Sequence, residues 1–277
     1  MIHPTAIIDP DATIAASVSI GAGAVVGAAV RLGAGCSIGP YAILEPGTEI
    51  AERVQIGAHA VIGGPPQDLG FDHATPSGVQ IGPGSCIREH VTINRSHEEN
   101  GVTRIGAGAF LMAGSHVGHG SSVGDSAVLA NLVMLAGHVQ VGAHAFLGGG
   151  AGIHQFVRIG ACAMVSGLSR ISRDVPPFLI VSERDRVNGL NLVGLRRREF
   201  SPETIRDIKE AFQAIYRHRG GQRERARVRL ATQPPATSQA REFLAFFEAG
   251  KRGFAQPATR QERSLKTPSG VNRHEMD

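Results

Sequence analysis

Residues 19–44 read SIGAGAVVGAAVRLGAGCSIGPYAIL, and an aliphatic residue returns in this stretch at every sixth position. The same spacing extends, with two interruptions, from the N-terminus to residue 171. The aliphatic positions are Ile2, Ile8, Ile14, Ile20, Val26, Leu32, Ile38, Leu44, Ile50, Ile56, Ile62, Ile81, Ile87, Ile93, Ile105, Leu111, Val117, Val123, Leu129, Leu135, Val141, Leu147, Ile153, Ile159, Val165 and Ile171. A period of six fits neither the turn of an α-helix nor the alternation of a long strand, so it predicts a repeat solenoid, a parallel β-helix.

The composition agrees with such a repeat. Three repeats make one triangular coil, and the aliphatic side chains point into a narrow prism that has no room for large rings. The chain accordingly has 36 glycines, no tryptophan and only 5% aromatic residues. Coils stack at the spacing of strands, roughly 4.8 Å, so residues eighteen positions apart should lie one above the other.

The repeat also divides the chain into domains. We expect a β-helix over residues 1–175, with loops projecting near 64–80 and 94–104, where Pro, Gly and charged residues break the pattern. Residues 176–254 are expected to form a smaller α-helical domain. Residues 255–277 have no periodicity, and we expect a disordered tail there.

Two helices are expected in the C-terminal domain. Ser201 is a good N-cap, and Pro202 follows it at the first helical position. The apolar residues that follow at helical spacing are Ile205, Ile208, Phe212 and Ile215. A second helix is expected around 240–249, which carries three phenylalanines.

Charge and cysteine content narrow the class of protein. The net charge of +4 comes largely from basic residues of the C-terminal third, so an acidic protein or a phosphorylated ligand is a candidate partner. Nucleic acid is not expected, because no aromatic residues are interleaved with the basic ones. Cys36, Cys86 and Cys162 are scattered singly, which predicts small buried residues of a reducing compartment. With no apolar leader and no apolar run of membrane length, we expect a soluble cytoplasmic protein without a membrane span.

The chemistry is expected at one corner of the prism. The stacking rule places His119, Gly137 and Gln155 in one column of three successive coils, with His138 and His154 one step to either side. Together with His116, four histidines should gather within roughly 10 Å. Aligned imidazoles of this kind suit a general base or a metal site. Lone corner histidines such as His59 and His144 are interpreted as solvated turn residues.

Several segments together carry a specific resemblance. They read AGSHVGHGSSVGDSAVLANLVMLAGHVQVG, AGIHQFVRIGACAMVSG, DVPPF, GPPQDLG, IREHVTINR and GLRRREF. In these segments the chain resembles the UDP-N-acetylglucosamine 3-O-acyltransferases that begin lipid A synthesis in Gram-negative bacteria, over nearly its whole length up to Phe254. The resemblance implies a left-handed β-helix and a homotrimer with its active site between neighbouring prisms. It also implies acyl carrier protein as the partner that supplies the acyl group, a UDP-sugar acceptor, and no cofactor or metal.

The resemblance also implies roles for individual residues. His119 matches the general base that takes the proton of the sugar 3-hydroxyl, and Gly137 matches the backbone N–H that stabilises the oxyanion. Asp68, with Gln67, matches the loop group that recognises a 3-hydroxyacyl chain, and Gly167 matches the floor of the acyl groove. The remaining matches are residues that bind the sugar nucleotide, among them Arg197 at a phosphate: His116, His138, His154, Gln155, Asn191 and Arg197.

One departure leaves alternatives open. The resembling family usually has an acidic residue directly after the general base, where this chain has Gly120. Loss of that carboxylate removes an orienting hydrogen bond and lowers the basicity of the imidazole. The acceptor is therefore either the 3-hydroxy sugar or a different nucleotide sugar, for example a 3-amino one. Two further hypotheses are a zinc enzyme similar to the γ-type carbonic anhydrases and an inert binding or scaffold protein.

Overall fold

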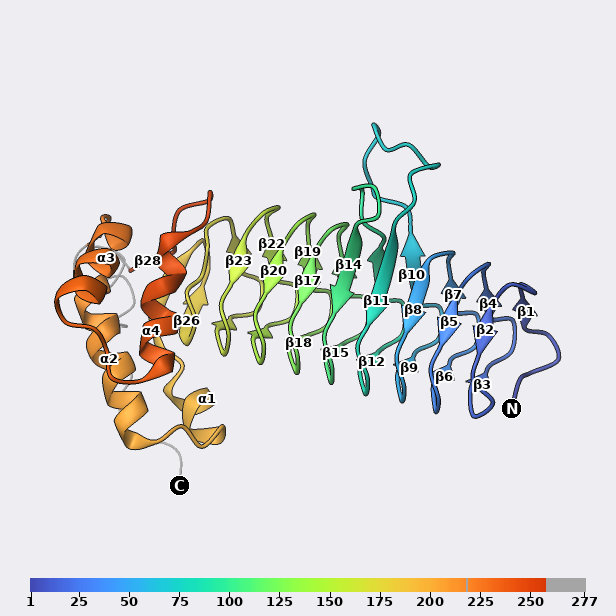
Figure 1. Cartoon of the computed structure of the whole chain (residues 1–277), viewed down its shortest axis with the longest axis horizontal. Coiled ribbons are helices and arrows are strands. Elements are labelled where there is room, and N and C mark those ends of the chain that lie inside the picture. Colours follow the sequence, from blue (N-terminus) through green and yellow to red (C-terminus); the bar gives the residue numbers. More distant parts are fainter. Residues whose placement is uncertain (218, 258–277) are drawn as a thin grey trace, which may run out of the picture.

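The computed structural model describes residues 1–217 and 219–257, which form a long prism with a helical segment at one end (Figure 1). Within this part of the chain the strands make three sheets of nine, eight and eleven strands. From β1 to β25 all pairing is parallel, and each strand pairs with the strand three places further along the chain. This is the winding of a parallel β-helix, as the period of six predicts.

The strand bounds follow the hexad period closely. The nine-stranded sheet contains β1 (Ile7–Ile8), β4 (Val25–Val26), β7 (Ile43–Leu44), β10 (Val61–Gly64), β13 (Thr92–Asn94), β16 (His116–Val117), β19 (Met134–Leu135), β22 (Gly152–Ile153) and β25 (Arg170–Ile171). The eight-stranded sheet contains β2 (Thr13–Ile14), β5 (Arg31–Leu32), β8 (Thr48–Ile50), β11 (Gly78–Ile81), β14 (Val102–Ile105), β17 (Ser122–Val123), β20 (Gln140–Val141) and β23 (Arg158–Ile159). The eleven-stranded sheet contains β3 (Ser19–Ile20), β6 (Ser37–Ile38), β9 (Gln55–Ile56), β12 (Cys86–Ile87), β15 (Phe110–Leu111), β18 (Val128–Leu129), β21 (Phe146–Leu147), β24 (Met164–Val165), β26 (Leu179–Ser182), β27 (Arg186–Leu190) and β28 (Gln256–Pro257).

The core of the prism is a stack of aliphatic side chains. Ile93, Val117 and Leu135 are in register on successive coils, and each is fully buried. The residue before each of these aliphatic positions points outward. Cys86 precedes Ile87 on β12 in this way and is therefore only half-buried. Cys36 and Cys162 are buried, as predicted. The prism is thus held together by neighbouring coils rather than by any single one.

Two loops project side by side from one edge of the prism (Figure 1). They cover residues 65–77 and 95–101, within the intervals where the repeat was expected to break. Arg95 joins them, because its guanidinium donates to the carbonyl of His73 over 2.8 Å and lies 4.9 Å above the ring of Phe71. The second loop is therefore fixed against the first instead of projecting freely.

The C-terminal part departs from the prediction at its beginning. After β25 the chain adds β26 in parallel to β24 and then turns back as the antiparallel strand β27, so the prism sheet continues to residue 190 and not to 175. The helical segment follows it. Its members are α1 (Leu192–Arg197), α2 (Pro202–Tyr216), α3 (Gln222–Thr232), α4 (Ser238–Ala245) and the short 3₁₀ helix η1 (Phe246–Glu248).

Helix α2 forms as the sequence predicts. The Ser201 side chain accepts from the Thr204 N–H over 3.1 Å, and Ile205, Ile208 and Ile215 are buried. The second expected helix is present as α4 and η1. Helices α1 and α3 were not predicted, since α3 is rich in arginine and begins at a glycine that offers no side-chain cap. None of the helices in the described residues is long and apolar enough to cross a bilayer.

The first three residues of the expected tail, 255–257, are folded. Ala255 is fully buried, and Gln256–Pro257 pair with β27 as strand β28. These residues therefore belong to the folded chain. The rest of the expected tail, residues 258–277, lies outside the described residues.

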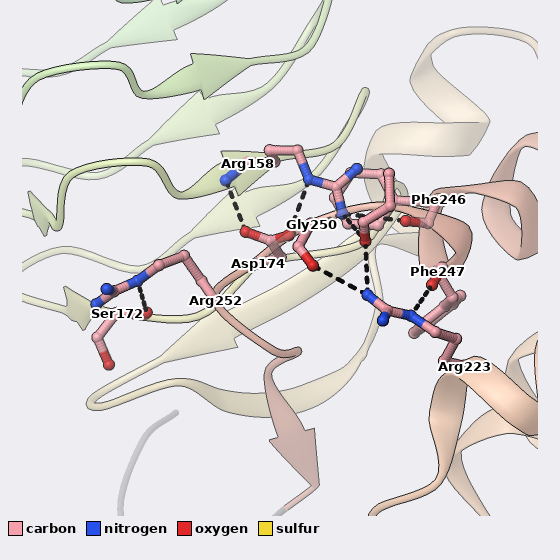
Figure 2. A network of polar contacts seen from close by, with 9 residues as sticks. Arg158, Ser172, Asp174, Arg223, Phe246, Phe247, Gly250 and Arg252 are labelled. Carbon is pink, nitrogen blue, oxygen red and sulfur yellow. Dashed lines mark hydrogen bonds and ion pairs between the residues drawn. The ribbon is translucent and has the colours of Figure 1, made fainter.

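A buried ion pair joins the prism to the helical segment (Figure 2). On β23, Arg158 contacts Asp174 over 2.7 Å, and its guanidinium also donates to the carbonyl of Phe246 over 3.1 Å. The Asp174 side chain is 1% exposed and that of Arg158 is 18% exposed. From α3, Arg223 donates to the carbonyls of Phe247 and Gly250, over 3.0 and 2.9 Å. Two arginines thus bind the same short segment from opposite sides.

Replacement of this carboxylate should destabilise the protein. Asp174→Ala leaves the Arg158 guanidinium largely buried without its counter-charge, and we expect the free energy of unfolding to fall by about 3 kcal/mol. Chemical denaturation followed by circular dichroism measures the change. Glu49→Ala is the matched control, because its pair with Arg31 is exposed and should contribute less than about 1 kcal/mol. Equal losses in the two variants would contradict the role given to Asp174.

Candidate functional site

The stacking of residues eighteen apart, which the sequence predicts, is present beside one corner of the prism. His116 pairs in register with Met134, and Met134 with Gly152, so residues eighteen apart lie above one another. His119 follows β16 and lies against Gly137 of the next coil. A Cβ atom added to Gly137 would lie 2.5 Å from Nε2 of His119, so the imidazole rests directly on the Gly137 backbone.

His138 completes the corner. Its N–H donates to the His119 carbonyl over 2.9 Å, and its ring stands edge-on to the His119 ring with 5.1 Å between centroids. The ring of Phe156 stacks on the ring of His138, with 4.8 Å between the two centroids and 9° between the two planes. The backbone at His138 has a φ of +58°, a left-handed conformation that residues at this corner position share. The ring orientation is therefore set by both the corner and the stacking.

A third imidazole, that of His97, was not predicted at the site. It comes from the loop 95–101, and its ring centroid lies 5.0 Å from that of His119 and 4.7 Å from that of His138. The stacking rule places residues within coils, and His97 stands in an insertion to which that rule does not apply. The available signal was its position in the second interruption of the repeat, where function was expected.

The environment of His119 makes it a neutral base. Burial of the ring lowers the pKa of His119, and the neighbouring His138 and His97 lower it further, whereas the Asp68 carboxylate raises it. Its Nδ1 atom is buried and has no hydrogen-bond partner among the described residues. At neutral pH the imidazole is therefore uncharged, with a lone pair that can accept a proton.

Gly120, directly after His119, stands where the resembling family usually has an acidic residue. Gly120 has a φ of +65°, and a Cβ added there would lie 2.8 Å from Nδ1 of His138. Its N–H donates to the hydroxyl of Thr103 over 2.9 Å. An acidic side chain at this position would thus have to displace His138, and within the described residues no other carboxylate bonds to His119 in its place.

A groove of about 790 Å³ follows the outer face of the nine-stranded sheet. It contains three of the predicted residues, Gln67, His116 and His154. His116 hydrogen-bonds Thr92 over 2.7 Å, and burial lowers the pKa of His116. The full lining is Gln67, Thr92, His116, Met134, Leu135, Ala136, Gly152, Ile153, His154, Arg170, Ile171, Ser172 and Arg184.

The nine-stranded sheet is bounded by two different corners of the prism. His119, Gly137 and Gln155 belong to the corner that leads from the nine-stranded to the eight-stranded sheet, and Gln155 is exposed there. Gly167 is exposed at the opposite corner, between β24 and β25. Because β25 lies three coils beyond β16, a ligand that contacts both the predicted base and the predicted acyl-groove residue has to run along the sheet as well as across it.

The remaining three predicted residues lie neither in the groove lining nor at these two corners. Asp68 is on the exposed loop 65–77, where its Oδ1 accepts from the Gly70 N–H over 2.9 Å. The Asn191 side chain caps α1 by accepting from the Gly194 N–H over 3.0 Å, and it donates to the Cys162 carbonyl over 3.0 Å, so its polar atoms have structural partners. Arg197 is exposed on α1 and is not brought to the histidines.

The chain is similar to known proteins in sequence and in fold. A family model described as Udp N-acetylglucosamine O-acyltransferase, Domain 2, matches residues 174–255, and a model of bacterial transferase hexapeptides (six repeats) matches residues 29–64. The protein of Janthinobacterium sp. named acyl-[acyl-carrier-protein]–UDP-N-acetylglucosamine O-acyltransferase is 40% identical over 91% of this chain and 98% of its own length. The protein of the same name from Synechocystis sp. is 49% identical, but the match spans only 55% of each chain.

Solved structures show the same likeness. The UDP-N-acetylglucosamine acyltransferase of Campylobacter jejuni is 34% identical with a TM-score of 0.86, over 93% of this chain and all of that one. The corresponding structure from Acinetobacter baumannii is 33% identical with a TM-score of 0.87, over 92% of this chain and 99% of that one. These superpositions confirm the expected fold class, a left-handed parallel β-helix followed by a smaller group of helices.

Proposed function

Because the chain belongs to the family of acyl-carrier-protein-dependent UDP-N-acetylglucosamine O-acyltransferases, we propose that it transfers a 3-hydroxyacyl group from acyl carrier protein to the 3-hydroxyl of UDP-N-acetylglucosamine. This is the first step of lipid A biosynthesis. The names of the relatives do not favour the alternative of a 3-amino nucleotide sugar. The proposal needs no metal and no dissociable cofactor.

One observation carries the mechanism, the contact between the His119 imidazole and the Gly137 backbone. His119 takes the proton of the sugar 3-hydroxyl as that oxygen attacks the carbonyl carbon of the thioester. The carbon–sulfur bond then breaks, and the leaving thiolate takes the proton from His119, which restores the neutral imidazole. The base begins and ends each turnover uncharged, in keeping with its lowered pKa.

Gly137 supports the same step from its backbone. Its N–H has no acceptor among the described residues, so it is available to the negative oxygen of the tetrahedral intermediate. Donor and base stand on consecutive coils, about one strand spacing apart, roughly 4.8 Å. A carbonyl group that lies beside both can be attacked next to the base while its oxygen accepts from the Gly137 N–H.

The groove is proposed to hold the sugar nucleotide, with His116, His138, His154 and Gln155 as its polar contacts. Met134 on the groove floor is 52% exposed, so a single chain leaves the site open to water. A homotrimer would cover this face with a neighbouring prism and exclude water from the reaction. It would also offer Arg197 of a neighbouring chain as a contact for the phosphates, for which a guanidinium is suited.

The helical end is proposed as the surface that meets acyl carrier protein. Arg196, Arg197 and Arg198 are all exposed at α1, and a basic surface of this kind attracts an acidic partner. The reducing, cytoplasmic location expected from the cysteines also remains part of the proposal.

The direct test is an assay of the purified protein with UDP-N-acetylglucosamine and 3-hydroxyacyl carrier protein, with the product identified by mass spectrometry. A 3-O-acylated sugar nucleotide is expected. Product that carries the acyl group at another position, or no product from the folded protein, would overturn the proposal. Sedimentation of the same sample should give the mass of three chains, and a stable, active monomer would exclude a site between chains.

Acyl length is expected to depend on Gly167. Among residues that are not its chain neighbours, a Cβ at this exposed corner would meet only the Gly149 backbone, with its carbonyl oxygen at 3.2 Å, and the glycine itself adds no side chain that narrows the groove. We expect long 3-hydroxyacyl chains to be preferred over medium ones and expect Gly167→Met to shift this preference toward shorter chains by about tenfold. Competition between carrier proteins that are loaded with two chain lengths measures both. A medium-chain preference of the unmodified enzyme would refute this role for Gly167.

A further inference from the structure

Three imidazoles from separate segments converge beside the proposed base. His97 comes from the loop 95–101, His119 from the corner after β16 and His138 from the corner after β19. One ring nitrogen from each lies within 4.8 Å of those of the other two. The rings meet at steep angles, 84° for His97 with His138 and 88° for His119 with His138, so they surround a common point instead of stacking.

The polar atoms of this group are not used elsewhere. Nδ1 of His97 and Nδ1 of His119 are both buried without a hydrogen-bond partner among the described residues. No ion pair ties any of the three rings to a carboxylate in that part of the chain. The Asp68 and Glu98 carboxylates are near enough to act on His119 and His138, and their charge favours a cation at this place. The three imidazoles therefore have nitrogen atoms that can bind a metal ion and that are not paired with other groups in the described residues.

We propose that His97, His119 and His138 form a binding site for a divalent transition metal such as Zn²⁺ or Co²⁺, and that an ion bound there inhibits acyl transfer. Imidazole nitrogen is a preferred ligand of these ions, and three protein ligands leave a fourth position for water. Zinc–nitrogen bonds of 2.0–2.1 Å place tetrahedral ligand atoms about 3.4 Å apart, so nitrogen atoms that lie up to 4.8 Å apart must approach each other by up to about 1.4 Å. Such closure is within reach of side-chain rotation, since His97 lies on a loop.

Inhibition follows because one of the three ligands, His119, is the proposed general base. A metal ion on His119 occupies the lone pair that would accept the proton of the sugar hydroxyl. This consequence rests on the proposed function, whereas metal binding itself depends only on the three side chains.

Titration of the metal-free full chain with Co²⁺ tests the binding directly, because tetrahedral imidazole-bound cobalt absorbs in the visible range. We expect one cobalt ion per chain and at least about tenfold weaker binding in His97→Ala. His116→Ala is the matched control, since this neighbouring histidine bonds Thr92 and is not one of the three ligands. Absence of the visible bands from the unmodified protein, or equal binding by His97→Ala, would overturn the site.

The acyltransfer assay supplies the second readout. Zn²⁺ should inhibit the unmodified enzyme reversibly, with recovery on addition of EDTA, and His97→Ala should require at least about tenfold more zinc for the same inhibition. If thermal unfolding shows that His97→Ala is not folded, His97→Gln replaces it in both experiments. Cobalt binding by a protein without acyltransferase activity would count against the proposed function only. Activity that zinc leaves unchanged in a protein that binds cobalt would overturn the inhibitory role.

Discussion

His119→Ala is expected to lower turnover by about 10² or more while the protein stays folded. The side chain lies outside the prism at a corner, so its loss removes no core packing, and the backbone bond from the His138 N–H to the residue 119 carbonyl is kept. What is lost is the neutral imidazole that accepts the proton of the sugar hydroxyl. Steady-state kinetics with saturating carrier protein measures the change, and circular dichroism establishes that the fold is retained.

His59→Ala is the matched control for this variant. His59 also stands at a corner with a left-handed backbone, φ +57°, and its ring stacks between Tyr41 and His90 at 5.3 and 5.1 Å. It lies at a different corner of the prism, two coils before His119, and does not line the groove, so its replacement should leave turnover unchanged. Near-full activity of His119→Ala would remove this residue from the role of general base, and a comparable loss in His59→Ala would show that corner histidines act through the fold.

The fold and part of the site could be predicted from the sequence because a repeat converts sequence distance into spatial distance. Residues 116, 134 and 152 are in register as a period of eighteen requires. The contact between His119 and Gly137 follows from the same arithmetic. No other information about the chain was needed to place these two residues together.

The limits of the prediction have physical causes as well. The prism was expected to end at Pro176-Pro177, yet β26 follows these residues in parallel with β24. The second residue after a strand leaves its N–H unbonded, as Ala22 and Ala28 show, so a proline such as Pro177 costs no hydrogen bond there. Pro40 stands at the same position in an N-terminal coil.

His97 could not be placed from the sequence for a different reason. Its loop is held by contacts between two insertions, such as the hydrogen bond from the Asn100 N–H to the Pro76 carbonyl over 2.7 Å. Contacts of this kind do not recur at a regular spacing along the sequence, so the repeat does not predict them. Helix α3 escaped prediction similarly, because it is fixed by tertiary contacts, for example the 3.0 Å bond from Arg223 to the carbonyl of Phe247, rather than by a capping residue or a strong apolar face.

Gly137→Ala is expected to reduce turnover by about 10² to 10³. The glycine is not required by the turn, since its φ is not positive and the same corner position holds Ala22, Ala28 and Ala34 in other coils. Its lack of a side chain instead makes room for the His119 ring, because a Cβ would lie 2.5 Å from Nε2 and 2.6 Å from Cε1. Alanine must therefore push the base away from the N–H donor.

The kinetic pattern should identify the cause of this loss. If the methyl group displaces the base and covers the oxyanion donor, kcat and kcat/KM fall together, because both contacts are made in the transition state. Gly152→Ala is the control for folding, since a Cβ at this position meets no atom within 4 Å and the variant adds the same methyl group one coil away. A rise in KM at unchanged kcat would show that Gly137 only shapes the substrate site. Full activity of Gly137→Ala would contradict the close contact between base and backbone on which the proposed mechanism depends.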